Sequence, residues 1–214
     1  MAGPHEILGM ARVLEIGTTE FLALYSDNGG TTLRSEADGR CVFLTPSGCR
    51  VHARRPLVCR LYPLGRSTDE RGEERFALFS AQPECEAEVG RGGTVAAFLE
   101  SQGIAPYLGW SRRYGEIYRR MIGLLERLDI QGKIDAPAAD APAEAAQAGS
   151  GTAGSGQEPD RAPLSSWQDI DASLAGYCAA KGIAVPAEID EAIALHLRAI
   201  EEWLDDLESR LGPA

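Results

Sequence analysis

The feature that most constrains the fold is a segment without sequence periodicity in the second half of the chain. Residues 135–163 consist almost entirely of Ala, Pro, Gly, Ser and acidic residues, and they include no aromatic residue. Such a composition cannot bury enough apolar surface to offset the entropy of ordering, so it predicts a disordered, flexible linker. The linker divides the chain into an N-terminal domain, residues 1–134, and a C-terminal helical segment, residues 164–214.

Short local patterns in the N-terminal domain predict an α+β fold. Apolar residues at helical spacing, with Thr and Gly at the expected ends, predict helices over 7–14, 18–25, 94–103 and 110–128. Between them, residues 31–34 and 41–44 are expected to pair as a short β-hairpin, and residues 75–80 to form a third strand. We therefore expect a small domain in which helices frame an irregular, cysteine-rich middle.

The C-terminal segment has the clearest periodicity of the sequence. Apolar residues three or four positions apart predict an amphipathic helix over about 186–211: Ile189, Ile193, Leu197, Ile200, Leu204, Leu207 and Leu211. This apolar stripe could pack against a helix over 167–181 as an αα-hairpin, or it could bind a protein partner as a coiled-coil seam. The acidic residues between 201 and 208 lie on its polar side, where contact with water is a sufficient explanation.

Charge and hydropathy exclude several classes of function. The net charge is -11, which argues against binding to nucleic acid or to an anionic membrane surface. No apolar run is long enough to span a membrane, and the first residues do not resemble a secretory signal, so we expect a cytoplasmic protein. Thiols stay reduced in the cytosol, so clustered cysteines there more often bind metal or act in catalysis than form disulfides.

Four of the five cysteines cluster in the middle of the N-terminal domain: Cys41, Cys49, Cys59 and Cys85. Their spacing lacks the C-x-x-C pairs that make a zinc prediction strong. Spacing alone therefore leaves two interpretations open, metal ligands or small apolar core residues.

The residues around these cysteines are more specific. Cys41-Val-Phe-Leu, Gly48-Cys49, the run Arg55-Pro-Leu-Val-Cys-Arg-Leu-Tyr-Pro63 and Pro83-Glu-Cys85 closely resemble the YkgJ-type cysteine-cluster family of zinc- or iron-chelating CxxCxxCC domains. The resemblance extends over about residues 5–125. It implies that the four cysteines hold zinc or an iron–sulfur cluster, two cofactors that the sequence does not distinguish. Flagellin N-methylases share this domain.

One departure from the family pattern affects the ligand set. Members of the family carry a further cysteine group upstream, whereas no cysteine precedes Cys41 in this chain. Either the true start lies upstream of Met1 or this member binds less metal. The first helix begins almost at Met1, which favours a truncated start.

Two arginines flank Cys59 closely in the sequence. Arg55 and Arg60 are expected to donate hydrogen bonds to sulfur or to backbone carbonyls and so to orient the ligands, unless they only form a solvated charged surface. We expect His52 to pack or to face solvent, and we assign no role to His5 or His196. Cys178, beyond the linker, is expected to be a semi-buried thiol.

Three functions follow from these observations. The first is a metal-binding protein whose cysteines hold zinc or an iron–sulfur cluster for a structural or redox purpose. The second, implied by the resemblance, is a role in protein lysine N-methylation. The third is an adaptor that binds a protein partner through residues 186–211. Phosphate-binding loops, nucleophile elbows and H-E-x-x-H helices do not occur in the sequence.

Overall fold

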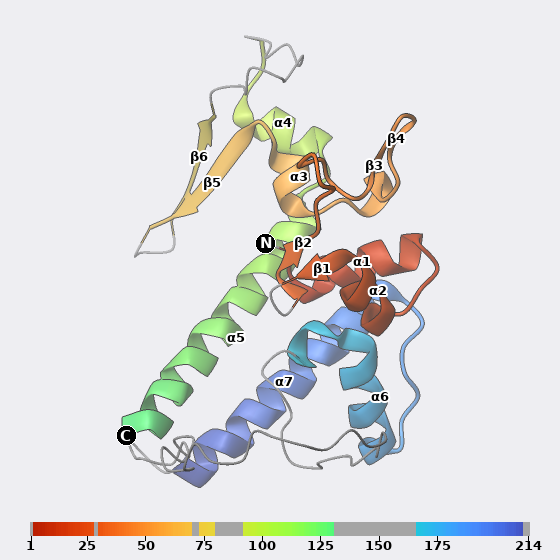
Figure 1. Ribbon diagram of the computed structural model, residues 1–214. Coiled ribbons are helices and arrows are strands. Elements are labelled where there is room, and N and C mark those ends of the chain that lie inside the picture. Colours follow the sequence, from red (N-terminus) through yellow and green to blue (C-terminus); the bar gives the residue numbers. More distant parts are fainter. Residues whose placement is uncertain (1, 28–29, 70–72, 80–91, 131–165, 212–214) are drawn as a thin grey trace, which may run out of the picture.

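The computed structural model describes residues 2–27, 30–69, 73–79, 92–130 and 166–211, without the side chains of residues 129, 130 and 166. The predicted linker and Cys85 lie outside these residues. Figure 1 shows an upper part of short elements and a lower part of long helices. The helices are α1 (Pro4–Val13), α2 (Thr18–Tyr25), α3 (Leu57–Leu61), α4 (Val95–Ser101), α5 (Ala105–Ile130), α6 (Ile170–Lys181) and α7 (Ile189–Leu211), with short 3₁₀ turns η2 (His52–Arg54) and η3 (Ser166–Gln168). The mixed α+β class predicted from the sequence is confirmed.

Local capping signals explain where several helices begin and end. The Thr94 hydroxyl accepts a hydrogen bond from the Ala97 N–H at 3.2 Å and caps α4, as the sequence predicts. Gly103 follows α4 with a φ of 59°, a left-handed conformation that glycine adopts without steric cost. At α2 the cap is Gly17 instead of the predicted Thr18, which is the first residue of the helix.

The β-structure consists of three antiparallel pairs in the described residues. The pairs are β1 (Ser26–Asp27) with β2 (Thr32–Leu33), β3 (Leu44–Thr45) with β4 (Gly48–Cys49), and β5 (Leu64–Thr68) with β6 (Glu74–Leu78). The predicted pairing of 31–34 with 41–44 is reduced to an isolated bridge between Ser35 and Cys41 and a hydrogen bond from the Val42 N–H to the Arg34 carbonyl. Instead, β2 pairs with β1 and β3 pairs with β4, because a partner nearer in the sequence leaves a shorter loop to close.

The largest hydrophobic core lies between the long helices. Its buried residues come from α1, α5, α6 and α7: Leu8, Tyr114, Ile117, Met121, Leu124, Ile170, Leu174, Ala192, Ile193, Leu197, Ile200 and Leu204. The periodic stripe of α7 is therefore covered by α5 and α6, which confirms the αα-hairpin and leaves the central positions of the stripe unavailable to a partner. The segments on both sides of the predicted linker share this core.

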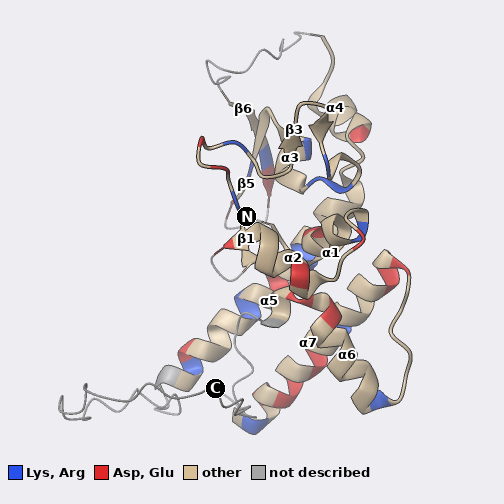
Figure 2. Cartoon of the chain, turned by 45° about the vertical axis from the view of Figure 1, so that its right-hand side comes forward, with Lys and Arg blue, Asp and Glu red and all other residues tan. Residues whose placement is uncertain are grey.

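The acidic face of α7 does more than contact water. Figure 2 shows acidic residues, in red, along α7. Arg120 of α5 binds Asp205 and Glu208, and its Nε donates to Glu208 at 2.7 Å. Arg113 approaches Glu201 at 3.4 Å. Solvation alone, as expected from the sequence, is thus an incomplete explanation, because part of this acidic face pairs with the basic face of α5. No helix in the described ranges is long and apolar enough to cross a membrane.

Candidate metal centre

Two buried residues, each two positions after a cysteine, fix the backbone that carries Cys41 and Cys49. Phe43 and Val51 are each 1% exposed and pack with α1 and α2 in a second core. Phe43 contacts the rings of Phe21 and Tyr25, with ring centroids 5.8 and 5.0 Å away. With Phe43 and Val51 anchored, Cys41 is exposed and Cys49, the last residue of β4, is half-buried.

Cys59 is presented by the short helix α3. Leu57 and Leu61 are four residues apart, so they lie on one face of the helix, where they are buried against Ile104 and its neighbours. Val58 and Cys59 consequently lie on the outer face and are exposed. The leucines therefore determine the direction in which the Cys59 thiol points.

The pKa of Cys59 reflects both its partial burial and the negative groups around it. Its pKa is raised, first because the protein removes part of the water around the sulfur, and further by the negative potential of Cys41, Cys49 and Glu6. All of the described cysteines are free of disulfides. Clustered thiols that oppose one another's ionisation favour a cation between them.

Arg60 braces the helix that carries Cys59. Its guanidinium donates to the carbonyls of Arg55, Ala53 and Gln102 at 3.0, 2.9 and 2.9 Å. It also lies 4.2 Å from the centre of the Tyr107 ring and donates to the Tyr107 hydroxyl at 2.8 Å. Only 9% of Arg60 is exposed, so it connects three backbone segments instead of forming a solvated surface.

Arg55 and Glu6 also form hydrogen bonds around α3. Arg55 donates to the His52 carbonyl at 3.0 Å and to the Gln102 side chain at 2.8 Å, and its charge lowers the pKa of Cys59. The buried Glu6 carboxylate accepts from the N–H groups of Gly3 at 2.8 Å and Leu57 at 2.5 Å. Glu6 thus joins the starts of α1 and α3. Its position in the first turn after Pro4 suggests the contact with α1, but not the contact with α3.

The other residues considered as ligands are His52, which is on the surface, and Cys178, which is in the core. His52 is exposed, in accord with the expected packing or surface role, and Cys178 is buried in α6 at 2% exposure. In the described part of the chain, no three Cys, His, Asp or Glu side chains lie together in a geometry that could hold a metal ion. The thiols of Cys41, Cys49 and Cys59 suit zinc and iron chemically, but a fourth donor and a tighter arrangement must come from elsewhere. Cys85 lies outside the described residues.

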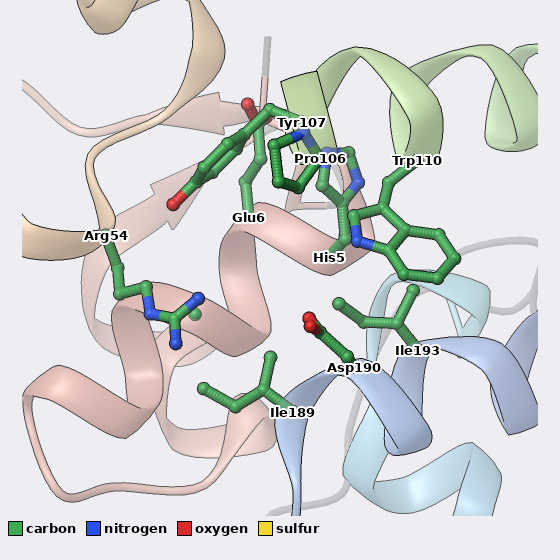
Figure 3. Close-up of a pocket in the computed structure, with 10 residues that line it drawn as sticks. His5, Glu6, Arg54, Pro106, Tyr107, Trp110, Ile189, Asp190 and Ile193 are labelled. Atoms are coloured by element: carbon green, nitrogen blue, oxygen red, sulfur yellow. The ribbon is translucent and has the colours of Figure 1, made fainter. Parts of the chain in front are cut away.

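A small cavity beside the cysteine-bearing part offers no alternative active site. It has a volume of about 30 Å³ and lies where α1, η2, α5 and α7 meet. Figure 3 shows His5 and Glu6 of α1 opposite Asp190 of α7, with Trp110 and Arg54 at the sides. A space of this size holds about one or two water molecules, too few for a substrate.

His5 and His196, which the sequence left without a role, are buried beside Tyr114. The Tyr114 hydroxyl lies 2.9 Å from His196 Nδ1, and the His5 ring stacks on the Tyr114 ring at a centroid distance of 5.4 Å. Burial lowers the pKa of each histidine to about 4, so both are neutral at physiological pH. Both rings pack at the junction of α1, α5 and α7.

The described structure therefore presents free thiols on the short helix α3 and beside the anchors Phe43 and Val51, without bringing three of them into a metal-binding geometry. Residues 7–85 match the family model CxxCxxCC, described as "Putative zinc- or iron-chelating domain". The match confirms the sequence resemblance over this segment, which contains Cys41, Cys49, Cys59 and Cys85 and excludes Cys178. Searches of curated proteins and of solved structures found no match to the chain.

Proposed function

We propose that residues 7–85 chelate zinc or iron, the latter as an iron–sulfur cluster, through Cys41, Cys49, Cys59 and Cys85. The observation that carries this proposal is the match of residues 7–85 to a chelating family, in a segment whose described cysteines, Cys41, Cys49 and Cys59, are all free and at least partly exposed thiols. Thiolates are the preferred ligands of both cofactors, and four of them complete a tetrahedral site. Cys85, at the end of the matched segment, would supply the fourth.

The arrangement of the described residues supports binding that is coupled to ordering. Cys41 and Cys59 are exposed, and the loop of Cys41 and the short helix of Cys59 are held by a few anchors such as Phe43 and Arg60. Metal binding would draw the loops together, so that part of the binding free energy becomes folding free energy. This suits a structural or redox role in the cytoplasm better than a role in lysine methylation or as an adaptor, which no contact of the described residues favours.

The test is the metal content of the full chain purified without oxygen. We expect zinc or iron in the wild-type protein and a lower metal-to-protein ratio in Cys59→Ser, because this change removes one exposed thiol and leaves Leu57 and Leu61 in place. Cys178→Ala is the matched control, since its thiol lies outside the matched segment. An unchanged ratio in Cys59→Ser, or an equal loss in Cys178→Ala, would remove Cys59 from the ligand set.

A further inference from the structure

An open groove is lined by one side of α3 and by part of α5. It runs between α5 and β5, which are seen at the left of Figure 1, and its floor is formed by the first residues of α1 and by η3. Its volume is about 740 Å³. Sites for small molecules span roughly 300–1,000 Å³, so this groove has the size of a ligand site.

The walls of the groove are apolar and partly aromatic. Val58, Phe79 and Tyr118 line it and are 60%, 61% and 52% exposed. The ring of Trp167 stacks against that of Tyr118, with centroids 6.5 Å apart and planes inclined by 28°. Large apolar side chains exposed together in a concave surface are typical of a binding site, and the flat rings favour a flat ligand.

Buried polar atoms without partners lie along the same groove. Gln168 is 2% exposed, and its Oε1 has no hydrogen-bond partner among the described residues. The same is true of Arg66 Nε and of both ring nitrogens of His5, which is 6% exposed. The other two nitrogens of the Arg66 guanidinium bind Ser111 and Glu74, so in the described part of the chain only its Nε lacks a partner. Buried polar groups are paired in the great majority of cases, so unpaired polar atoms on three residues that line one groove indicate that the groove binds a polar ligand.

The unpaired atoms differ in what they require. Gln168 Oε1 can only accept a hydrogen bond, Arg66 Nε can only donate one, and a neutral His5 ring offers one donor and one acceptor. A carboxylate would serve only the donors, and a hydrocarbon would serve none. We propose that the groove binds a small, planar heteroaromatic molecule that carries both a ring N–H donor and a ring nitrogen or carbonyl acceptor.

The experiment uses the full chain and benzimidazole as the probe, a flat bicycle with one N–H donor and one acceptor nitrogen. Binding is followed through the indole N–H signal of Trp167 in the NMR spectrum, assigned with Trp167→Phe. We expect a saturable shift of this signal. Indole, which keeps the shape and the donor but lacks the acceptor nitrogen, should bind about tenfold more weakly, because it leaves a buried donor unpaired.

Two variants and one control locate the site. Tyr118→Leu removes a wall of the groove, and Gln168→Leu removes the buried acceptor; each should weaken benzimidazole binding about tenfold. Trp203→Leu is the control, because Trp203 is also 52% exposed but does not line the groove. If Gln168→Leu fails to fold, Tyr118→Leu still tests the location of the site, because replacement of a half-exposed side chain should leave the fold intact.

Three outcomes would overturn the proposal: no shift of the Trp167 signal, equal binding of indole and benzimidazole, or equal weakening by Trp203→Leu and Tyr118→Leu. The proposal does not depend on metal binding. Equal results with and without a chelator are therefore expected.

Discussion

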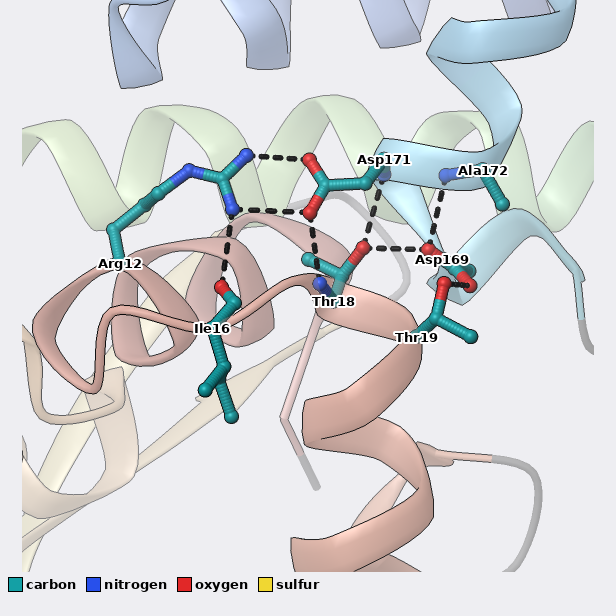
Figure 4. A network of polar contacts seen from close by, with 7 residues as sticks. All are labelled: Arg12, Ile16, Thr18, Thr19, Asp169, Asp171 and Ala172. Carbon is teal, nitrogen blue, oxygen red and sulfur yellow. Dashed lines mark hydrogen bonds and ion pairs between the residues drawn. The ribbon is translucent and has the colours of Figure 1, made fainter.

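Two hydrogen bonds join Thr18, in the N-terminal part of the chain, to Asp171, in the C-terminal part. The Thr18 N–H donates to Asp171 Oδ2 at 2.8 Å, and the Asp171 N–H donates to Thr18 Oγ1 at 2.9 Å (Figure 4). Both residues lie in the first turn of their helices, α2 and α6, where backbone N–H groups lack partners within the helix. Each helix start is thus completed by a side chain of the other helix.

Asp169 and Arg12 extend this contact. Asp169 caps α6 through the Ala172 N–H at 3.1 Å and accepts from the hydroxyls of Thr18 and Thr19 at 2.5 and 2.6 Å. Arg12 forms an ion pair with Asp171. Burial alone would raise the pKa of Asp171, but the hydrogen bonds from Arg12 and from the Thr18 N–H together hold it below its ordinary value. The contact joins the family-matched segment to the C-terminal helices.

We predict that Asp169→Ala lowers the free energy of unfolding by about 2 kcal/mol or more, because it removes a helix cap and leaves a buried hydroxyl without an acceptor. Urea unfolding measures this change. Asp206→Ala is the control, since Asp206 only pairs with Arg210 on an exposed surface of α7, and should cost less than about 1 kcal/mol. Equal effects of the two changes would show that the contact between α2 and α6 does not stabilise the fold.

We predict that acidification destabilises the protein between pH 6.5 and about 4 through His5 and His196. Both have a folded pKa of about 4 against an ordinary value of 6.5, so the unfolded chain binds more protons in this window. The free energy of unfolding therefore falls as the pH drops from 6.5 to 4, by up to about 3 kcal/mol per histidine. The loss should end below the folded pKa.

His196→Gln tests the origin of this pH dependence. Its side-chain oxygen can still accept from the Tyr114 hydroxyl, but it does not titrate. Urea unfolding at a series of pH values should give a shallower slope for this variant than for the wild type. An identical slope would contradict the assignment to His196, which faces Tyr114 and the nearby charge of Asp169.

We predict that Arg60→Lys destabilises the fold by about 3 kcal/mol even though it keeps the charge. A lysine ammonium cannot reach the three backbone carbonyls and the Tyr107 hydroxyl that the guanidinium binds together. Arg40→Lys, at an arginine whose side chain is 63% exposed, serves as the control and should change stability by less than about 0.5 kcal/mol. A similarly small effect of Arg60→Lys would mean that this brace is dispensable.

Local sequence signals predicted the helices well. Thr94 and Gly103 mark the two ends of α4, and the periodic leucines and isoleucines mark α7, because capping and amphipathic spacing depend on residues within a few positions of one another. Cysteine-rich loops could be located in the same way, from the residues that adjoin Cys41, Cys49 and Cys59. These features depend on neighbouring residues and can be predicted without knowledge of the tertiary fold.

Features that depend on distant contacts could not be predicted. The strand β5 begins after Pro63 and includes Gly65, Arg66 and Ser67, so it shows no alternation of apolar residues that would reveal it. The pairing partner of a two-residue strand such as β2 depends on which loop closes first. The β-propensity of its residues does not determine that partner. Asp169 and Thr18 lie on opposite sides of the predicted linker in the sequence, so no local sequence pattern predicts their contact.

The central claim is that the four clustered cysteines hold a metal, and thiol alkylation tests it most directly. Full-length protein purified without oxygen is treated with iodoacetamide before and after removal of metal by a chelator, and labelling of each cysteine is followed by mass spectrometry. Cys41 and Cys59 are exposed, so only a bound metal would protect them, whereas Cys178 is protected by burial. We predict that Cys41, Cys49, Cys59 and Cys85 react only after chelation and that Cys178 stays slow in both states. Equal labelling rates of Cys59 before and after chelation would contradict the claim.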